Sequence, residues 1–281
     1  MQTVAVIGAG TMGHGIAHVC ALAGYDTRLT DARADALDAA RAAIAGNLRK
    51  GVEKGKVAQA DADAALARLV TATSLAEACA GADLVIEAVP EDLALKQRLL
   101  ALAEAAVGPH AVLASNTSSL SIDAIAQGVT RPERVIGMHF FNPVHVMELL
   151  ELVRGPRTDE AVVLASREFG ARLGKDVIVV RDAPGFATSR LGVALGMEAI
   201  RMVEQGVASP EDIDKAMVLG YRHPVGPLKL TDMVGLDVRM AIGSYLATAL
   251  GNPAFEPPAL MREMVAEGKL GKKSGRGFYS W

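Results

Sequence analysis

The chain has 281 residues, enough for about two domains, and 51% of them are hydrophobic, so a sizeable core can form. The net charge of −3 gives no strong positive charge that would attract nucleic acid, and only 4% of the residues are aromatic, so few side chains could stack on bases. Both features argue against nucleic acid as a main partner. The N-terminus enters an apolar run directly, and no apolar run approaches the roughly 18 residues of a membrane helix. We therefore expect a cytoplasmic protein without a signal peptide or membrane partner.

The first stretch predicts a dinucleotide-binding site. Residues 4–7 form an apolar run typical of a strand buried on both faces, and an apolar helix follows up to Ala23. Between them, Gly8 permits a tight turn, Gly10 lets the backbone approach a pyrophosphate, and Gly13 lets the helix pack closely on the strand. The free N–H groups at the start of the helix suit phosphate. The predicted cofactor-binding turn consists of Gly8, Ala9, Gly10, Thr11, Met12 and Gly13.

The choice of cofactor depends on Asp31. It lies 18 residues after Gly13, at the end of the next predicted strand, 27–31. A carboxylate at that place can bind both ribose hydroxyls of NAD, whereas it would repel the 2′-phosphate of NADP. We therefore predict NAD, although the nearby Arg33 keeps NADP open.

Strands and helices alternate further along the chain, as they do in a doubly wound sheet. Two helices, 34–50 and 61–69, come before a short third strand, and the turn between them carries Lys50, Lys54 and Lys56. These lysines are either ordinary solvated charge or a landing point for an anionic part of the substrate, and the residues alone favour the first. Further strands are expected at 70–72, 83–89, 111–115, 135–140, 149–153 and 177–180, with helices at 91–105 and 158–173.

The turn at 182–185 marks the predicted domain boundary, so residues 1–183 form a Rossmann-type α/β domain and residues 184–281 an all-helical domain. Helical patterns cover 186–205, 228–250 and 258–267, and another helix starts with Ser209 as its N-cap and Pro210 at its first position. The tail from 271 is rich in glycine but ends in aromatic residues, so we expect it to be ordered. Cys20 and Cys79 are expected in the core.

The candidate catalytic pair is His139 and Glu151, which are 12 residues apart in two predicted strands. If the strands are neighbours, the carboxylate can reach Nδ1 of the ring and make Nε2 a better proton acceptor, as removal of a hydroxyl proton requires. The alternative is a histidine satisfied by the core and an edge-strand glutamate, and spacing alone does not decide. No histidine or cysteine spacing indicates a metal site, and no Gly-x-Ser-x-Gly indicates a serine hydrolase.

Six motifs, at 8–13, 87–91, 115–119, 139–143, 184–186 and 271–273, together carry a family resemblance. On these motifs, and over essentially its whole length, the chain resembles the 3-hydroxyacyl-CoA dehydrogenase family, in its bacterial 3-hydroxybutyryl-CoA dehydrogenase type. The resemblance implies NAD-dependent, reversible oxidation of (S)-3-hydroxyacyl-CoA to 3-oxoacyl-CoA in fatty acid or butanoate metabolism. It also implies a homodimer formed through the C-terminal domain, which shares the substrate cleft. A dehydrogenase of a non-CoA 3-hydroxy acid and a non-catalytic NAD-binding protein are the alternatives.

The resemblance also implies roles for single residues. His139 would be the catalytic base and Glu151 its partner, while Ser118 and Asn142 would bind the substrate oxygens or the cofactor. The family usually has Asn where Ser189 stands, near the reacting centre, so Ser189 would act through a water or suit a different acyl chain. Further NAD contacts would be Asp31, Glu91, Lys96, Asn116 and Lys273, and the CoA contacts would be Lys54 and Asn47.

Overall fold

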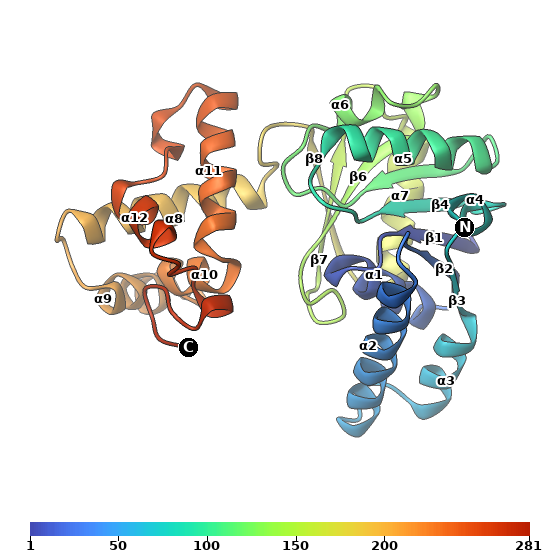
Figure 1. Cartoon of the computed structure of the whole chain (residues 1–281), viewed down its shortest axis with the longest axis horizontal. Coiled ribbons are helices and arrows are strands. Elements are labelled where there is room, and N and C mark those ends of the chain that lie inside the picture. Colours follow the sequence, from blue (N-terminus) through green and yellow to red (C-terminus); the bar gives the residue numbers. More distant parts are fainter. The chain divides into compact units, whose positions relative to one another are not determined.

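The computed structural model describes all 281 residues, which divide into two compact units, 1–182 and 183–281 (Figure 1). The first unit is built on an eight-stranded sheet in the order β3-β2-β1-β4-β5-β6-β7-β8. The strands are β1 (Thr3–Ile7), β2 (Asp26–Thr30), β3 (Leu69–Ala72), β4 (Leu84–Glu87), β5 (Val112–Ser115), β6 (Val135–Phe140), β7 (Leu149–Arg154) and β8 (Asp176–Arg181).

Strand direction places the site within this sheet. Strands β1 to β6 are parallel to their neighbours, β7 is antiparallel to β6, and β8 is parallel to β7. Strand order reverses at β1, which lies between β2 and β4, so the loops that follow β1 and β4 diverge to opposite faces. Doubly wound sheets bind their ligands in such a crevice, outside the carboxyl ends of the strands. The predicted fold class is therefore confirmed.

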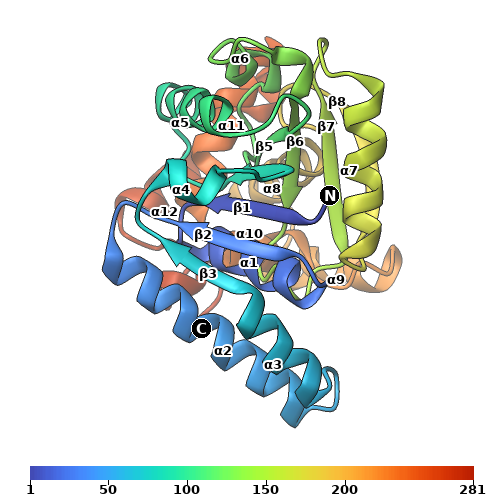
Figure 2. The same cartoon turned by 90° about the vertical axis from the view of Figure 1, so that its right-hand side faces the viewer.

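Helices cover both faces of the sheet (Figure 2). On one face lie α1 (Thr11–Leu22) and α7 (Glu160–Arg172), and on the other lie α4 (Leu75–Cys79), α5 (Leu93–Ala106) and α6 (Ile122–Ala126). The short helices α4 and α6 and a 3₁₀ turn over Pro132–Arg134 were not predicted. Ser74 and Ser121 cap α4 and α6 through their side chains.

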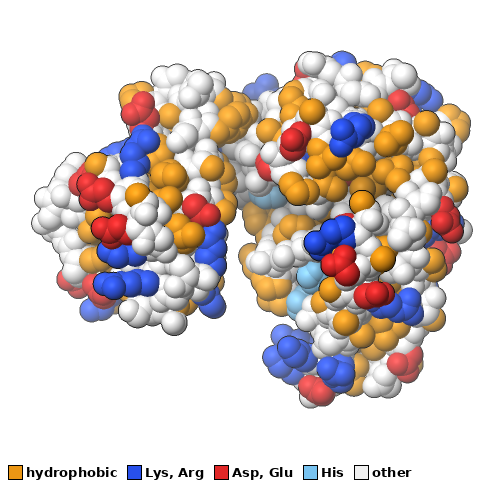
Figure 3. All heavy atoms as spheres, in the orientation of Figure 1, with side chains coloured by type: hydrophobic (Ala, Val, Ile, Leu, Met, Phe, Trp, Pro, Cys, Tyr) orange, Lys and Arg blue, Asp and Glu red, His pale blue; other side chains and the backbone are white.

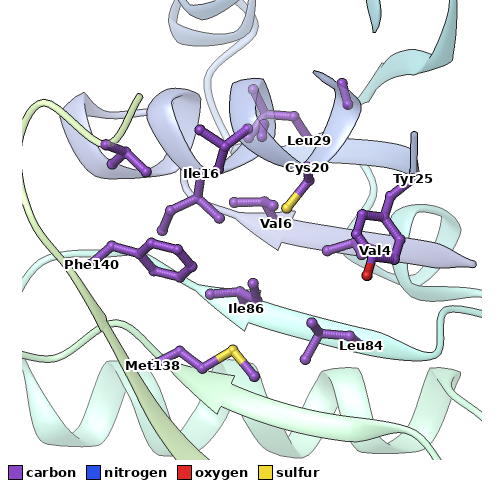
Figure 4. Close-up of a cluster of buried hydrophobic side chains, with 14 of the residues drawn as sticks. Val4, Val6, Ile16, Cys20, Tyr25, Leu29, Leu84, Ile86, Met138 and Phe140 are labelled. Carbon is purple, nitrogen blue, oxygen red and sulfur yellow. The ribbon is translucent and has the colours of Figure 1, made fainter. Parts of the chain in front are cut away.

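The core beneath α1 explains why the first strands form as predicted (Figure 4). Ile16 and Cys20 of α1 pack in one cluster with Val4 and Val6 of β1, and all four are fully buried. Each fully buried aliphatic side chain of this size stabilises the folded state by about 1.5–3 kcal/mol relative to leaving it exposed. Cys20 and Cys79 are both buried and free, so their prediction as core residues is confirmed.

The helical pair α2 (Ala34–Glu53) and α3 (Gln59–Arg68) forms a hairpin ahead of β3 (Figure 1). Leu37, Ile44 and Leu48 give α2 one buried face, against which Ala62 and Ala65 of α3 are buried. The far end of the hairpin is polar, and Lys and Arg side chains gather there (Figure 3). Lys50, Lys54 and Lys56 are all exposed at this end.

The second unit is helical. Its predicted helical run 228–250 is two helices, because Gly235 has a φ of 106° and the axes meet at 101°. The start of α9 is confirmed, since the Ser209 side chain accepts a hydrogen bond from Asp212 N. The helices are α8 (Thr188–Glu204), α9 (Pro210–Lys215), a π-helical turn (Ala216–Gly220), α10 (Pro227–Val234), α11 (Leu236–Leu250) and α12 (Ala259–Ala266), with 3₁₀ turns at Pro253–Phe255 and Lys272–Ser274.

The tail of the chain is ordered, as predicted. Asp232, which is fully buried, accepts hydrogen bonds from Phe278 N, Tyr279 N and the Trp281 indole nitrogen. No single helix has both the length and the apolar character to span a membrane, and only the bent pair α10–α11 reaches that length when its two parts are joined.

Candidate active site

The glycine turn after β1 has the geometry of a phosphate-binding loop. Gly8 has a φ of 100°, and a Cβ there would lie 2.9 Å from the carbonyl oxygen of Ala88. A Cβ on Gly13 would lie 1.7 Å from the carbonyl oxygen of Gly8, so only glycine lets α1 start this close to the turn. Gly10, in contrast, faces open space. It precedes the first turn of α1, which carries no acidic residue, so the positive end of the helix is not neutralised.

A cavity of about 460 Å³ opens beside this turn. Its wall is formed by small residues of α2 and by the segment after β4, and Asp31 and Arg33 border it. Asp31 Oδ2 accepts a hydrogen bond from Ala9 N at 2.8 Å, and Oδ1 accepts one from Arg33 N at 3.0 Å. Asp31 also borders a second hollow of about 400 Å³ lined by Thr73, Leu75 and Leu95. The turn, the helix end and the fixed carboxylate together fit a dinucleotide with free ribose hydroxyls.

His139 and Glu151 are brought together by the sheet. They are register partners on the antiparallel strands β6 and β7. His139 Nδ1 lies 2.9 Å from Glu151 Oε2, with Glu151 fully buried and His139 only 7% exposed. The Phe141 ring packs against the imidazole, with ring centroids 4.4 Å apart. The predicted geometry of neighbouring strands and a carboxylate on Nδ1 is therefore confirmed.

The polar segment 116–119 lies at the same carboxyl edge, after β5. Glu91 accepts hydrogen bonds from Ser118 N at 3.0 Å and from the Thr117 hydroxyl. Asn116 Oδ1 accepts one from Phe140 N at 2.9 Å, which ties this segment to the strand that carries His139. Asn142 follows β6 and is exposed. These predicted residues thus gather at one edge of the sheet.

Among the other predicted residues, Lys96 lies at this same edge. Lys96 is fully buried, with its ammonium between Glu87 and Glu91. Asn47 and Lys54 lie on α2 and at its end. In the second unit, Ser189 lies in the first turn of α8, and Lys273 pairs with Asp237 at 2.6 Å.

No site role was predicted for Glu87, Ser115 or Thr117, although they lie in the motifs 87–91 and 115–119. All three are fully buried, and their side chains hydrogen-bond at the carboxyl ends of β4 and β5. A charged residue at the end of the apolar run 84–86 was the available signal for Glu87, because a buried carboxylate requires partners.

Known proteins resemble this chain over its full length. Residues 3–183 match the family model of the 3-hydroxyacyl-CoA dehydrogenase NAD-binding domain, and residues 185–281 match that of the C-terminal domain. A 3-hydroxybutyryl-CoA dehydrogenase of Bradyrhizobium diazoefficiens is 45% identical over 100% of this chain and 96% of its own length. The crystal structure of (S)-3-hydroxybutyryl-CoA dehydrogenase from Ralstonia eutropha has a TM-score of 0.96 at 43% identity, covering 100% of this chain and 99% of its own. A diketoreductase that acts on dicarbonyl compounds has a TM-score of 0.86 at 31% identity, covering 100% and 99%.

Proposed function

The chain belongs to the 3-hydroxyacyl-CoA dehydrogenase family of NAD-dependent oxidoreductases, and we propose that it oxidises (S)-3-hydroxybutyryl-CoA or a similar short (S)-3-hydroxyacyl-CoA to the 3-oxoacyl-CoA. The observation that carries the proposal is the His139–Glu151 hydrogen bond at the carboxyl edge of a sheet with a dinucleotide turn. A nearly buried histidine held by a fully buried carboxylate suits a base, because the acid fixes both ring orientation and tautomer.

The proposed chemistry uses one proton and one hydride. With Nδ1 donating to Glu151, Nε2 is the nitrogen that accepts the proton of the substrate hydroxyl. NAD, when bound, accepts the hydride from the carbinol carbon. Glu151 stabilises the imidazolium that results, and in the reverse direction His139 returns the proton to the carbonyl oxygen. A positioned base of this kind contributes about 10²–10⁴ in rate.

We assign the cofactor to the glycine turn (residues 8–13) and to Asp31, which fits the ribose end. Glu91, Asn116, Ser118 and Asn142 are proposed for the reacting end, because they gather at the same sheet edge. Lys273 and Ser189 of the second unit are proposed for cofactor and substrate on the family resemblance alone.

The CoA part is proposed to meet Lys54 and Asn47 on the α2–α3 hairpin. Exposed lysines at its end, Lys54 among them, offer positive charge to phosphate groups. The hairpin is stiffened by its own buried face, so these side chains have a fixed support.

We also propose a cytoplasmic homodimer, paired through the helical unit, that works in fatty acid or butanoate metabolism. This unit exposes three large apolar side chains, each by more than 70%: Leu191, Leu219 and Tyr221. Exposed apolar surface of this kind is typical of a protein–protein interface. Light scattering of the purified protein measures the stoichiometry directly.

The test of the function is a turnover profile. Purified protein with NADH and acetoacetyl-CoA should lose absorbance at the nicotinamide band, with NADPH giving much slower loss. 3-Oxoacyl-CoA substrates of graded length then define the acyl chain. Absence of turnover with every acyl-CoA, despite tight NADH binding, would contradict the proposal and favour a non-catalytic NAD-binding protein.

A second candidate is reduction of a carbonyl substrate without CoA. It is favoured by the full-length likeness to the diketoreductase, which acts on dicarbonyl compounds. In that case acetoacetate or a diketo ester should turn over as fast as acetoacetyl-CoA, and loss of the Lys54 charge should change nothing.

A further inference from the structure

A fully buried carboxylate lies at the centre of the sheet, and the chemistry above does not use it. Glu87 is the last residue of β4, paired with Ile7 of β1 on one side and Ser115 of β5 on the other. Its side chain is 0% exposed and accepts hydrogen bonds from the Ser115 hydroxyl, Val89 N and Lys96 Nζ. Burying a charge is costly unless it is paired, and here the pairing is complete.

The partner of Glu87 is Lys96, which is also 0% exposed. Its Nζ lies 2.8 and 3.0 Å from the two oxygens of Glu87, 3.2 Å from the Val89 carbonyl oxygen and 3.2 Å from Glu91 Oε2. An ammonium has three protons, and four protein oxygens already surround this one. The Lys96 ammonium is therefore fixed in place, and Glu91 is the partner through which it reaches the segment after β5.

Glu91 passes this contact on to the segment after β5. Its Oε1 accepts hydrogen bonds from the Thr117 hydroxyl and from the backbone N–H groups of Ser118 and Ser119, at 3.0 and 3.3 Å for the latter two. Its Oε2 faces Lys96. One carboxylate thus joins the buried ammonium to the backbone on both sides of the Ser118 side chain.

The backbone of Glu87 supports the same segment from the other side. Its carbonyl oxygen accepts a hydrogen bond from Asn116 N at 2.9 Å, and Asn116 Oδ1 accepts one from Phe140 N. Phe140 follows His139 directly. Glu87 is therefore linked by hydrogen bonds to both segments that carry proposed catalytic residues.

We propose that Glu87 is a positioning residue for the reaction: it locks Lys96, Lys96 fixes Glu91, and Glu91 holds the 117–119 backbone in the geometry that cofactor and substrate require. The inference rests on the proposed function. Fold stability alone gives no reason for this arrangement, since replacing a buried ion pair by apolar side chains is often neutral or stabilising. Its place at the carboxyl edge, with hydrogen-bonded links to the segments that carry Ser118 and His139, gives a functional one.

The test compares Lys96→Met, Glu87→Gln and a matched control. The control is Arg134→Met, which breaks another buried ion pair of the same unit, Arg134 with Glu104, at 2.9 Å. In Lys96→Met and Glu87→Gln we expect kcat with acetoacetyl-CoA to fall about 10- to 100-fold, as for a displacement of reacting groups by about 1 Å. The KM for the acyl-CoA should change much less, because the CoA contacts are elsewhere. Arg134→Met should keep both constants.

The pH profile separates a positioning role from a merely structural one. Burial raises the pKa of Glu91, but the Lys96 ammonium and hydrogen bonds from Thr117 and Ser118 outweigh it and hold the pKa below its usual value. Lys96→Met removes the largest of these lowering influences, so the acid limb of kcat/KM should move to higher pH. In Glu87→Gln the ammonium still faces Glu91, so the limb should not move upward.

NADH affinity, measured by fluorescence, keeps this test independent of the proposed function. The affinity for NADH should weaken about tenfold in Lys96→Met even if the true substrate is another carbonyl compound. Failure of the wild type to turn over any acyl-CoA would count only against the proposed function. If Lys96→Met does not fold, Glu87→Gln, which retains the Lys96 ammonium, replaces it in the comparison with Arg134→Met. Wild-type kcat, NADH affinity and pH profile in a folded variant of either residue would overturn the inference.

Discussion

The carboxyl edge and the amino edge of the sheet in the first unit each contain a buried ion pair, and the two pairs hold different parts of the molecule in place. At the carboxyl edge, Lys96 and Glu87 are tied to segments that carry proposed site residues. At the amino edge, Arg134 and Glu104 are tied only to loops: Arg134 donates to the carbonyl oxygens of Gly108 and Ala111, and Glu104 accepts from Thr130 N. A buried ion pair therefore does not by itself indicate function. What it holds in place does.

The largest effect that separates the edges is expected from His139→Gln. Glutamine cannot take up the hydroxyl proton, so kcat should fall by about 10²–10⁴. The unfolding midpoint in urea should change little, because a polar side chain of similar size remains. Full turnover in this variant would show that the proton is accepted elsewhere.

A smaller effect is expected at the cofactor end of the same edge. Asp31→Ser removes the carboxylate that accepts a hydrogen bond from Ala9 N and faces the cavity. NADH should then bind about 10- to 100-fold more weakly, because one or two strong charge-assisted hydrogen bonds are lost. NADPH should bind relatively better, since its 2′-phosphate no longer meets a negative charge. Titration of both cofactors by fluorescence measures this, and an unchanged preference would exclude Asp31 as its cause.

A milder effect is expected at the end of the α2–α3 hairpin, which belongs to neither edge. Lys54→Ala should raise the KM for acetoacetyl-CoA about fivefold and leave kcat unchanged, because an exposed charge contact to a phosphate contributes only about 1 kcal/mol. Lys56→Ala is the matched control on the same turn. Equal effects of the two variants would indicate general attraction of anions rather than a specific contact.

At the amino edge we expect a change in stability and none in turnover. Burial has the largest influence on Glu104 and raises its pKa, but hydrogen bonds from Thr130 and Arg134 outweigh it, so the pKa lies below its usual value. A lowered pKa stabilises the fold above about pH 4.5, where the unfolded carboxyl is also ionised, and this contribution is lost as the pH falls through the folded pKa.

Glu104→Gln should accordingly lower the free energy of unfolding by about 2 kcal/mol at pH 7, with a smaller difference from wild type at pH 3.5. Urea unfolding at the two pH values measures this, and kcat/KM at pH 7 should equal that of the wild type. A loss of turnover here would mean that the two edges are coupled after all.

The first unit was predictable because its signals are local and redundant. The apolar run 84–86, the glycine turn and Asp31 each indicate the same fold, and β4 and the cavity lie where they predict. The helices α4 and α6 are too short, at five residues each, to show a helical period. The break at Gly235 was missed because apolar spacing continues across it.

The site was predictable only in part, for a related reason. His139 and Glu151 had two equally good interpretations until the register of β6 against β7 made them partners. Glu87 begins the motif 87–91, but no role was predicted for it. Its proposed role depends on Ser115 and Lys96, which reach it only once the two strands β4 and β5 and the helix α5 are assembled.

The antiparallel return of β7 has a consequence for how this protein tolerates insertions and deletions. Because side chains alternate along a strand, deleting Leu152 while Val153 and Arg154 keep their register would move Glu151 by one position and turn it to the opposite face of the sheet, away from the imidazole. Residues lost from the part of the connection after Asn142, at 143–148, would leave that alternation intact. Natural length variation should therefore be found in the connection and be absent from the two strands it joins.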